Sequence, residues 1–443
     1  MTGVIENMDL VEAFTGKLPN NLDKELYARI LKTIFLKPYL PSKSLMDAHN
    51  ISKRDLLELY ALIRNSSEAI TLFEYSPYPF LISLFSQLTK NAERTLPILQ
   101  GKVPSPPWET MELFMSKVCN ANCKFCYRNG QTYEFASVIS GPRIVQLINE
   151  FADFGGVNLD ISGGLEPLLS PSINEALGAG INRKLNVGLY TNGIALDAQK
   201  TVSQIMKINR IRVSLNAVNR ESYQKIMGVD KFDSVMRNIE KLVKAREKSN
   251  SRVKIGIGFL VCPDNFKDVY KVIKLAQELQ VDFLGLRSVE VVETSNFSEL
   301  QKSEISDILN RVRHENYNGR FGKLNVNIAD TLSSLVDSSF EGLRYVKKEL
   351  VNALPYFRIT VTPDGKFYAL NLIGQPSRAD DRYLLGELNA KSSLSDLPKK
   401  NKLIPFELKL LLSHDFSLIM ALSKLQSDLE IGISLENNPF NWA

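Results

Sequence analysis

Between residues 110 and 290, short apolar runs alternate with amphipathic segments, and this alternation limits the fold more than any other feature. Helical periodicity is clear in SVMRNIEKLVKAREK and FKDVYKVIKLAQELQ. Strands alternating with helices at this spacing form parallel βαβ units. We therefore predict an α/β fold, a partial (β/α)6 barrel of the TIM type, with its reactive groups at the carboxyl ends of the strands. The predicted strands are residues 112–118, 157–162, 185–191, 211–216, 253–261 and 281–289.

The 443 residues exceed the usual size of one domain, so further domains are expected. Residues 1–105 are predicted as an N-terminal helical domain, 106–320 as the barrel, and 321–443 as a C-terminal extension containing a β-hairpin and helices. Pro-Asp-Gly in RITVTPDGKFYALNL marks the hairpin turn, and the final helical segment is expected to cover the barrel. The N-terminal stretch LMDAHNISKRDLLELYALI also permits a helix-turn-helix, but no densely basic helix supports DNA binding, which favours a bundle that packs on the barrel or dimerises.

Composition narrows the class of protein. The net charge of +5, from 54 basic and 49 acidic residues, is too small to indicate a nucleic-acid partner. No run approaches the length of a membrane span and no signal peptide is visible, so we expect a cytoplasmic protein. Four cysteines in so long a chain make no disulfide framework, and clustered thiols in a reducing compartment are expected to be ligands or redox groups.

Three of the four cysteines lie in CNANCKFCY, residues 119–127, directly after the first predicted strand and therefore at the reactive end of the barrel. The spacing C-x3-C-x2-C puts Cys119, Cys123 and Cys126 on one short loop. A structural zinc ion would need a fourth ligand, which only Cys262 or one of three scattered histidines could supply. A [4Fe–4S] cluster takes one thiolate per iron, so three thiolates leave one iron open to another ligand. A zinc-stabilised binding protein remains the alternative outside catalysis.

With Phe125 before its last cysteine, this loop resembles the signature of the radical S-adenosylmethionine (SAM) superfamily. The resemblance implies a [4Fe–4S] cluster on the three cysteines, SAM at the open iron, and reductive cleavage of SAM to a 5′-deoxyadenosyl radical that abstracts hydrogen from the substrate. It implies an electron donor such as flavodoxin or ferredoxin. It also places Phe125 beside the adenine and Tyr127 among the cofactor-binding residues.

Two glycine-containing turns extend the resemblance. SGGLEP (162–167) follows the second strand and resembles the Gly-Gly-Glu-Pro element of the family, with Leu165 as an insertion; in the family the backbone of this element meets the methionine amino group. YTNG (190–193) follows the third strand and also resembles the family. Taken singly, either would be ordinary turn chemistry. The residues thereby implied to bind the cofactor are Gly163, Gly164, Glu166, Thr191 and Asn192.

The fourth predicted strand has a polar face. Arg212, Ser214 and Asn216 share it by the two-residue period of a strand, whereas Ile211 and Val213 face the helices. A polar inner face suits the ribose and carboxylate of the cofactor. An internally paired or solvated polar face is the alternative.

Two further residues are candidates for the chemistry. Cys262 shares the inner face of the fifth strand with Gly256, Gly258 and Leu260, next to the expected radical. Several radical SAM epimerases use one such cysteine as a hydrogen-atom donor, although a lone cysteine is otherwise most often a small buried hydrophobe. Arg287, at the end of the sixth strand, is a candidate for the SAM carboxylate or a substrate anion, with a structural ion pair as the alternative.

Over residues 40–395 the chain resembles the branch of the superfamily found in antibiotic deoxysugar pathways, of the TDP-4-amino-4,6-dideoxyglucose deaminase type. The resemblance rests on SGGLEP, YTN, IRVSLN followed by ESY, FLGLR, and VTPDGKFYALNLIG with LLGELN. It implies a nucleotide-linked carbohydrate substrate in natural product biosynthesis, with elimination, dehydrogenation and epimerisation all open. The alternative is a peptide-modifying enzyme of the epimerase type, since the lack of any cysteine after Cys262 excludes cysteine-bound auxiliary clusters in the extension.

Overall fold

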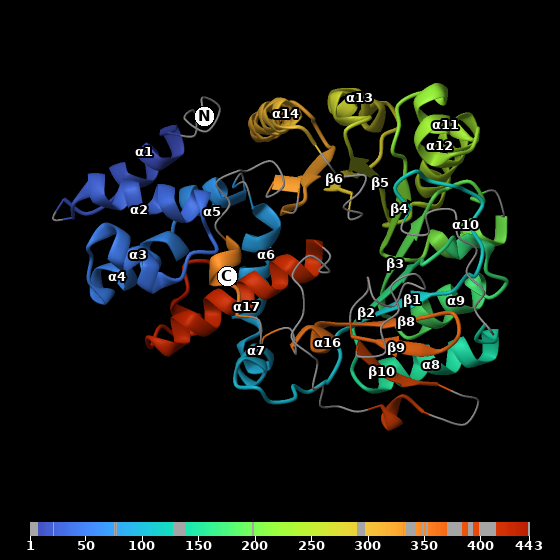
Figure 1. Ribbon diagram of the computed structural model, residues 1–443, viewed down its shortest axis with the longest axis horizontal. Coiled ribbons are helices and arrows are strands. Elements are labelled where there is room, and N and C mark those ends of the chain that lie inside the picture. Colours follow the sequence, from blue (N-terminus) through green and yellow to red (C-terminus); the bar gives the residue numbers. More distant parts are fainter. Residues whose placement is uncertain are drawn as a thin grey trace.

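The computed structural model describes most of the chain. The described residues are 8–20, 22–74, 76, 78–126, 138–196, 199–289, 297–330, 332–333, 342–347, 350, 353–369, 383–388, 393–397 and 413–441. A group of N-terminal helices stands beside a body in which helices surround a sheet (Figure 1). Within the described ranges, no helix combines the length and apolarity that crossing a membrane would require.

A ten-stranded sheet forms the centre of the larger body, in the order β10-β9-β8-β1-β2-β3-β4-β5-β6-β7. Strands β1 to β6 pair in parallel with their sequence neighbours, which confirms the predicted α/β class and all six predicted strands. Their bounds are β1 Thr110–Phe114, β2 Asn158–Ser162, β3 Asn186–Thr191, β4 Arg210–Ser214, β5 Lys254–Val261 and β6 Phe283–Ser288.

Helices cover one face of this sheet, here called the outer face (Figure 1). Helix α9 approaches so closely that a Cβ on Gly180 would lie 2.7 Å from Val187 and 2.9 Å from Leu159. Because neighbouring residues of a strand point to opposite faces, Asp160 and Gly188 belong to the other, inner face. The helices that connect the strands are α8 Gly141–Asp153, α9 Ile173–Asn182, α10 Gln199–Ile205, α11 Arg220–Met227, α12 Phe232–Ser249, α13 Val269–Glu278 and α14 Glu299–Tyr317, with short 3-10 turns η2 Pro167–Leu169 and η3 Phe266–Asp268.

Four strands extend the sheet beyond the six that were predicted with the barrel. β7 (Asn325–Ile328) pairs in parallel with β6. β8 (Arg358–Val361) pairs in parallel with β1, and β9 (Lys366–Tyr368) folds back on it, which confirms the hairpin around Pro-Asp-Gly, whose Gly365 has φ +90°. β10 (Leu384–Glu387) then pairs with β9. The extension therefore continues the sheet at its β1 edge. Its other described elements are η5 Gly342–Tyr345, α16 Leu354–Phe357 and η9 Leu394–Asp396.

The N-terminal region is helical, as predicted, and contains no strand among its described residues. Its helices are α1 Met8–Gly16, α2 Lys24–Leu36, α3 Ser42–His49, α4 Lys53–Arg64, α5 Ser67–Glu74, α6 Pro79–Lys90 and α7 Ala92–Leu99. Apolar residues at helical spacing form their shared core; in α4 these are Leu56, Leu59, Tyr60 and Ile63.

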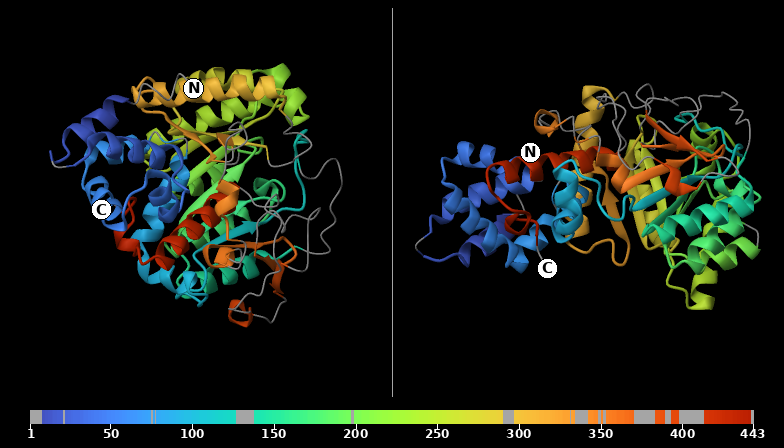
Figure 2. Two further views of the ribbon diagram at one scale, coloured as in Figure 1. Left: turned by 60° about the vertical axis from the view of Figure 1, so that its left-hand side comes forward. Right: turned by 90° about the horizontal axis from the view of Figure 1, so that it is seen from below.

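The last helix, α17 (Ser413–Glu430), corrects the expectation that the final segment covers the barrel. It packs against α3 and α6 of the N-terminal region, and beyond η11 (Leu435–Asn437) the ring of Phe440 stacks on Phe85 at 5.0 Å. Residues 417–425 are all buried. A helix buried on every side belongs inside a core and not on a surface, so the end of the chain completes the N-terminal domain (Figure 2).

Candidate active site

Register places the predicted inner-face residues of β4, β5 and β6 side by side. Arg212 is paired with Gly256 and Ser214 with Gly258, while Leu260 on β5 is paired with Arg287 on β6. In β4 the outward residues are fully buried and the inward ones are partly exposed. The predicted assignment of faces is therefore confirmed for this strand.

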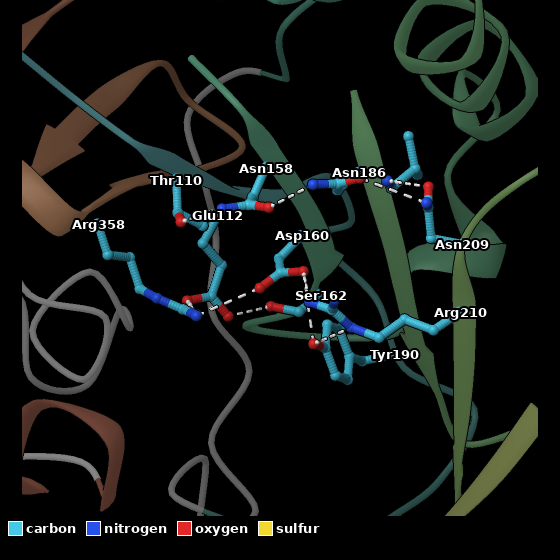
Figure 3. A network of polar contacts seen from close by, with 11 residues as sticks. Thr110, Glu112, Asn158, Asp160, Ser162, Asn186, Tyr190, Asn209, Arg210 and Arg358 are labelled. Atoms are coloured by element: carbon cyan, nitrogen blue, oxygen red, sulfur yellow. Dashed lines mark hydrogen bonds and ion pairs between the residues drawn. The ribbon is translucent and has the colours of Figure 1, made fainter. Parts of the chain in front are cut away.

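Charged residues cross the inner face between β8 and β4 (Figure 3). Arg358 donates to Glu112 at 2.8 Å and to Asp160 at 3.2 Å. On the other side Arg210 donates to Asp160 at 2.6 Å and to the Tyr190 hydroxyl at 3.1 Å. The two carboxylates are almost fully buried. Buried carboxylates need such partners, so this network fixes β8 of the extension to the barrel strands.

Nearer the carboxyl ends of the strands, Arg212 lies with its guanidinium carbon 4.4 Å from the centre of the Tyr190 ring. Glycine leaves room for it, because a Cβ on Gly258 would lie 3.1 Å from the Arg212 side chain. Arg287 is partly exposed on the same face. Arg212 and Arg287 are therefore partly exposed on the inner face, nearer the carboxyl ends of the strands than the charged network of Figure 3.

The cysteine loop lies past the carboxyl end of β1, although four residues separate the end of that strand from Cys119, where direct succession was predicted. The loop is held by the C-terminal end of α11. The Asn122 N–H donates to the Met227 carbonyl at 3.0 Å and the Lys124 N–H to the Ile226 carbonyl at 2.9 Å. The carbonyls at the end of a helix have no intrahelical hydrogen-bond partners. The N–H groups of the loop supply those partners here.

The chemistry of the donor set fits an iron–sulfur cluster better than a single ion. All three loop cysteines are partly buried thiols. Among the described side chains, no three His, Cys, Asp or Glu groups stand close enough together to hold one metal ion. A cluster takes one thiolate on each of three irons, so its thiolates stand further apart than the ligands of one ion.

The turns after β2 and β3 meet the cysteine loop through Asn192. Its amide donates to the Asn120 side chain at 2.7 Å and lies 3.7 Å from Cys119 Sγ. Glu166 accepts hydrogen bonds from the Thr191 hydroxyl at 2.6 Å and the Asn192 N–H at 2.8 Å. The predicted turns thus come together beside Cys119, with Glu166 and Thr191 binding each other.

Burial raises the pKa of Glu166, while the N–H groups of Asn192 and Leu168 and the Thr191 hydroxyl act against that rise. The carboxylate is therefore engaged inside the protein. Gly163 is required by the turn itself, since a Cβ there would lie 1.6 Å from the Leu165 carbonyl oxygen.

The remaining predicted cofactor residues have mixed positions. Gly164 is buried in the turn after β2, and Phe125 is partly buried against the hydrophobic core. Tyr127 lies outside the described residues. Asn216 is fully occupied by the protein, because its Oδ1 accepts from the Leu260 N–H at 2.8 Å and its Nδ2 lies 3.3 Å from Met227 Sδ. The structure therefore gives Asn216 a role in joining the loop after β4 to β5.

Cys262 follows β5 and is only 5% exposed, yet it is not part of the contiguous hydrophobic core. Burial raises the pKa of its thiol. Two residues on, Asp264 binds Lys124 of the cysteine loop at 2.6 Å and Lys225 of α11 at 3.1 Å. The loop that carries Cys262 is thus tied to the cysteine loop through Asp264.

Sequence reasoning missed several residues of this site. Glu112, Asp160 and Arg358 of the inner-face network carry no motif. Tyr223, the last residue of ESY, and Met227 lie on the α11 face that meets the cysteine loop. The signals in the sequence were the ESY stretch for Tyr223 and helical spacing for Met227, and neither identified a role at the site.

Residues 113–276 match the family model of the Radical SAM superfamily. A probable GTP 3′,8-cyclase of Saccharolobus islandicus is 28% identical over 205 residues, which cover 46% of this chain and 64% of the relative. The dTDP-4-amino-4,6-dideoxy-D-glucose ammonia-lyase of Streptomyces venezuelae is 23% identical over 301 residues, 64% of this chain and 62% of the relative. The matches span somewhat less than two thirds of these relatives.

The fold also resembles a solved structure. Streptococcus suis SuiB bound to precursor peptide SuiA superposes with a TM-score of 0.51 at 13% identity, covering 86% of this chain and 83% of that one. Together with the matched domain, this likeness confirms the partial barrel.

Proposed function

Since residues 113–276 make this chain a member of the radical SAM superfamily, whose enzymes use a [4Fe–4S] cluster and SAM, we propose that it abstracts hydrogen from a nucleotide-linked carbohydrate. Cys119, Cys123 and Cys126 would hold the cluster. When bound, the cluster supplies the electron that cleaves SAM to a 5′-deoxyadenosyl radical. The chain's own residues then have to bind the substrate, exclude water and end the substrate radical.

The observation that carries the substrate proposal is the charge on the inner face. Glu112 and Asp160 are matched there by Arg358 and Arg210. Two further arginines, Arg212 and Arg287, lie on the same face nearer the strand ends and are partly exposed. A guanidinium presents several donors in one plane and suits phosphate oxygens. The stack of Arg212 on Tyr190 would hold that plane in one orientation.

The relatives support the same substrate class. The names of both curated relatives contain a nucleotide phosphate, GTP in one and a dTDP-sugar in the other. A nucleoside diphosphate is therefore the group we propose for the two arginines. The sugar it carries would lie toward the cysteine loop.

Cys262 is proposed to end the substrate radical. Its S–H bond would break, the hydrogen atom would form a new C–H bond, and a thiyl radical would remain. One electron from the reductant and one proton from solvent would then restore the thiol. A flavodoxin or ferredoxin is the proposed one-electron donor, and a reducing cytoplasm is the proposed location because exposed thiols stay reduced there.

The experiment that tests the function is release of 5′-deoxyadenosine from the reconstituted, reduced protein without oxygen. We expect stimulation by TDP- or UDP-sugars and none by the same sugars without a nucleotide. Release only with peptides would overturn the substrate proposal, and stoichiometric zinc without sulfide would overturn the cofactor proposal.

Charge recognition is tested by Arg287→Gln and Arg212→Gln. Loss of a charge-assisted contact worth about 1.5–3 kcal/mol predicts a KM for the nucleotide sugar roughly 10- to 100-fold higher. The matched control is Arg237→Gln, since Arg237 is an exposed arginine on α12. An unchanged KM in both test variants would remove the arginines from the binding site.

A further inference from the structure

Tyr223 is a buried tyrosine whose hydroxyl has no hydrogen-bond partner among the described residues. The residue is on α11 and is fully buried. An unpaired buried hydroxyl costs free energy, so such groups in a folded protein call for an explanation. The ring is held in place, with its centre 5.8 Å from that of Phe232 in an edge-to-face arrangement.

The position of Tyr223 on α11 directs it to the cysteine loop. Met227 lies four residues later, on the same side of the helix, and its Sδ is 3.8 Å from Cys123 Sγ. The last carbonyls of the same helix bind the loop at Asn122 and Lys124. Tyr223 therefore belongs to the surface on which the loop is built.

Burial is the largest cause of the raised pKa of the Tyr223 hydroxyl. The next causes are the nearby acidic groups Cys123, Glu166 and Cys119. A phenol hydroxyl can donate one hydrogen bond, and a sulfur atom or a carboxylate oxygen can accept it. Glu166 already accepts from the Thr191 hydroxyl and from the backbone N–H groups of Asn192 and Leu168. The Tyr223 hydroxyl makes no hydrogen bond to Glu166 in the structure, which leaves sulfur at the cysteine loop as the acceptor to consider.

We propose that Tyr223 donates its hydroxyl hydrogen to a sulfur atom of the cluster held by the cysteine loop and so raises the reduction potential of that cluster. This inference rests on the proposed function. Reduction adds negative charge to the cluster, and a hydrogen bond to sulfur stabilises the more negative state. Tyr223 is thus a positioning residue that adjusts how readily the cluster accepts its electron.

The test is an EPR redox titration of the wild type, Tyr223→Phe and Tyr270→Phe. Tyr270 on α13 also has a buried hydroxyl oxygen, but its ring lies near Arg311 of α14 and not at the cysteine loop. We expect Tyr223→Phe to shift the potential to more negative values by a roughly tenfold change in the reduction equilibrium, about 59 mV for one electron. Tyr270→Phe should leave it unchanged.

A second substitution tests the same inference even if Tyr223→Phe fails to fold. Replacing Tyr223 with 3,5-difluorotyrosine keeps the ring and makes the hydroxyl a stronger donor, so the potential should move the opposite way. Iron and sulfide are counted in every sample. A full cluster whose potential is the same in the wild type and both Tyr223 variants would overturn the inference alone. A wild type that holds no cluster would overturn the proposed function and the inference with it.

Discussion

The thiol of Cys262 is the group proposed to end the substrate radical. It is 5% exposed, and burial raises its pKa, so the group is S–H and not thiolate at neutral pH. Only the S–H form can give a hydrogen atom to carbon. In D2O the exchangeable thiol becomes S–D, and we expect one deuterium in the product of each turnover, measured by mass spectrometry.

Cys262→Ser should release 5′-deoxyadenosine at a rate close to wild type while product deuteration falls at least tenfold, because an O–H bond is too strong to quench a carbon radical. The release of 5′-deoxyadenosine is the internal control for cluster and SAM. Equal deuteration in the variant would return Cys262 to the class of buried core residues.

Individual site residues differ in how far the sequence predicted them. Glu166, Thr191 and Asn192 were predicted from the resemblance of SGGLEP and YTNG to elements of the family, and both elements lie at the carboxyl ends of parallel strands, which share one edge. Asn216 was predicted as a cofactor-binding residue, but its side chain contacts Leu260 and Met227. Strand periodicity does not specify whether an amide binds a ligand or the protein itself. Arg358 was missed because its partners Glu112 and Asp160 lie about 200 residues or more away in the chain.

At the scale of elements, six strands were predicted to within a few residues because hydrophobic alternation identifies βαβ units. The four added strands were harder. β7 and β10 have only four residues each, too few for a period. β8 was predicted as part of a hairpin, but its parallel pairing with β1 requires a contact distant in sequence. The alternation of apolar segments in the sequence locates the strands but does not determine which strands pair with each other.

The junction between α11 and the cysteine loop depends on Gly228. It has φ +70°, and a Cβ there would lie 2.2 Å from the Asn122 carbonyl oxygen. Gly228→Ala should therefore cost about 1 kcal/mol of folding stability for the backbone conformation and also displace the loop. We expect at least a twofold loss of iron bound per chain after reconstitution.

The matched control is Gly319→Ala. Gly319 has φ +65°, but nothing lies within 4 Å of an added Cβ. It should show a similar loss of folding stability in urea with full iron content. Equal iron in the two variants would mean that the loop does not depend on this contact.

At the scale of the whole molecule, a buried carboxylate on α17 connects the C-terminal helix to the N-terminal helices. Lys424 and Asp428 of α17 are 1% and 2% exposed and 2.6 Å apart. The other oxygen of Asp428 accepts from the Ser42 N–H at 2.8 Å, at the start of α3. A single carboxylate thus neutralises a buried ammonium and caps a helix more than 380 residues away. The sequence predicted that this segment is helical but not where it packs, because its residue pattern does not identify the surface that α17 contacts.

Asp428→Ala should therefore destabilise the N-terminal domain by about 3–5 kcal/mol, since it leaves a buried ammonium without its partner. Urea unfolding followed by circular dichroism measures the change. The control is Glu278→Ala, which removes an equally spaced pair with Lys274 that is 61% and 78% exposed and should cost less than about 0.5 kcal/mol. Replacing Lys424 with Met and Asp428 with Leu together should recover most of the loss, because the buried charge disappears with its partner. A single variant no less stable than its control would mean that Lys424 is not buried as an ammonium, and that the C-terminal helix is held by its apolar surface alone.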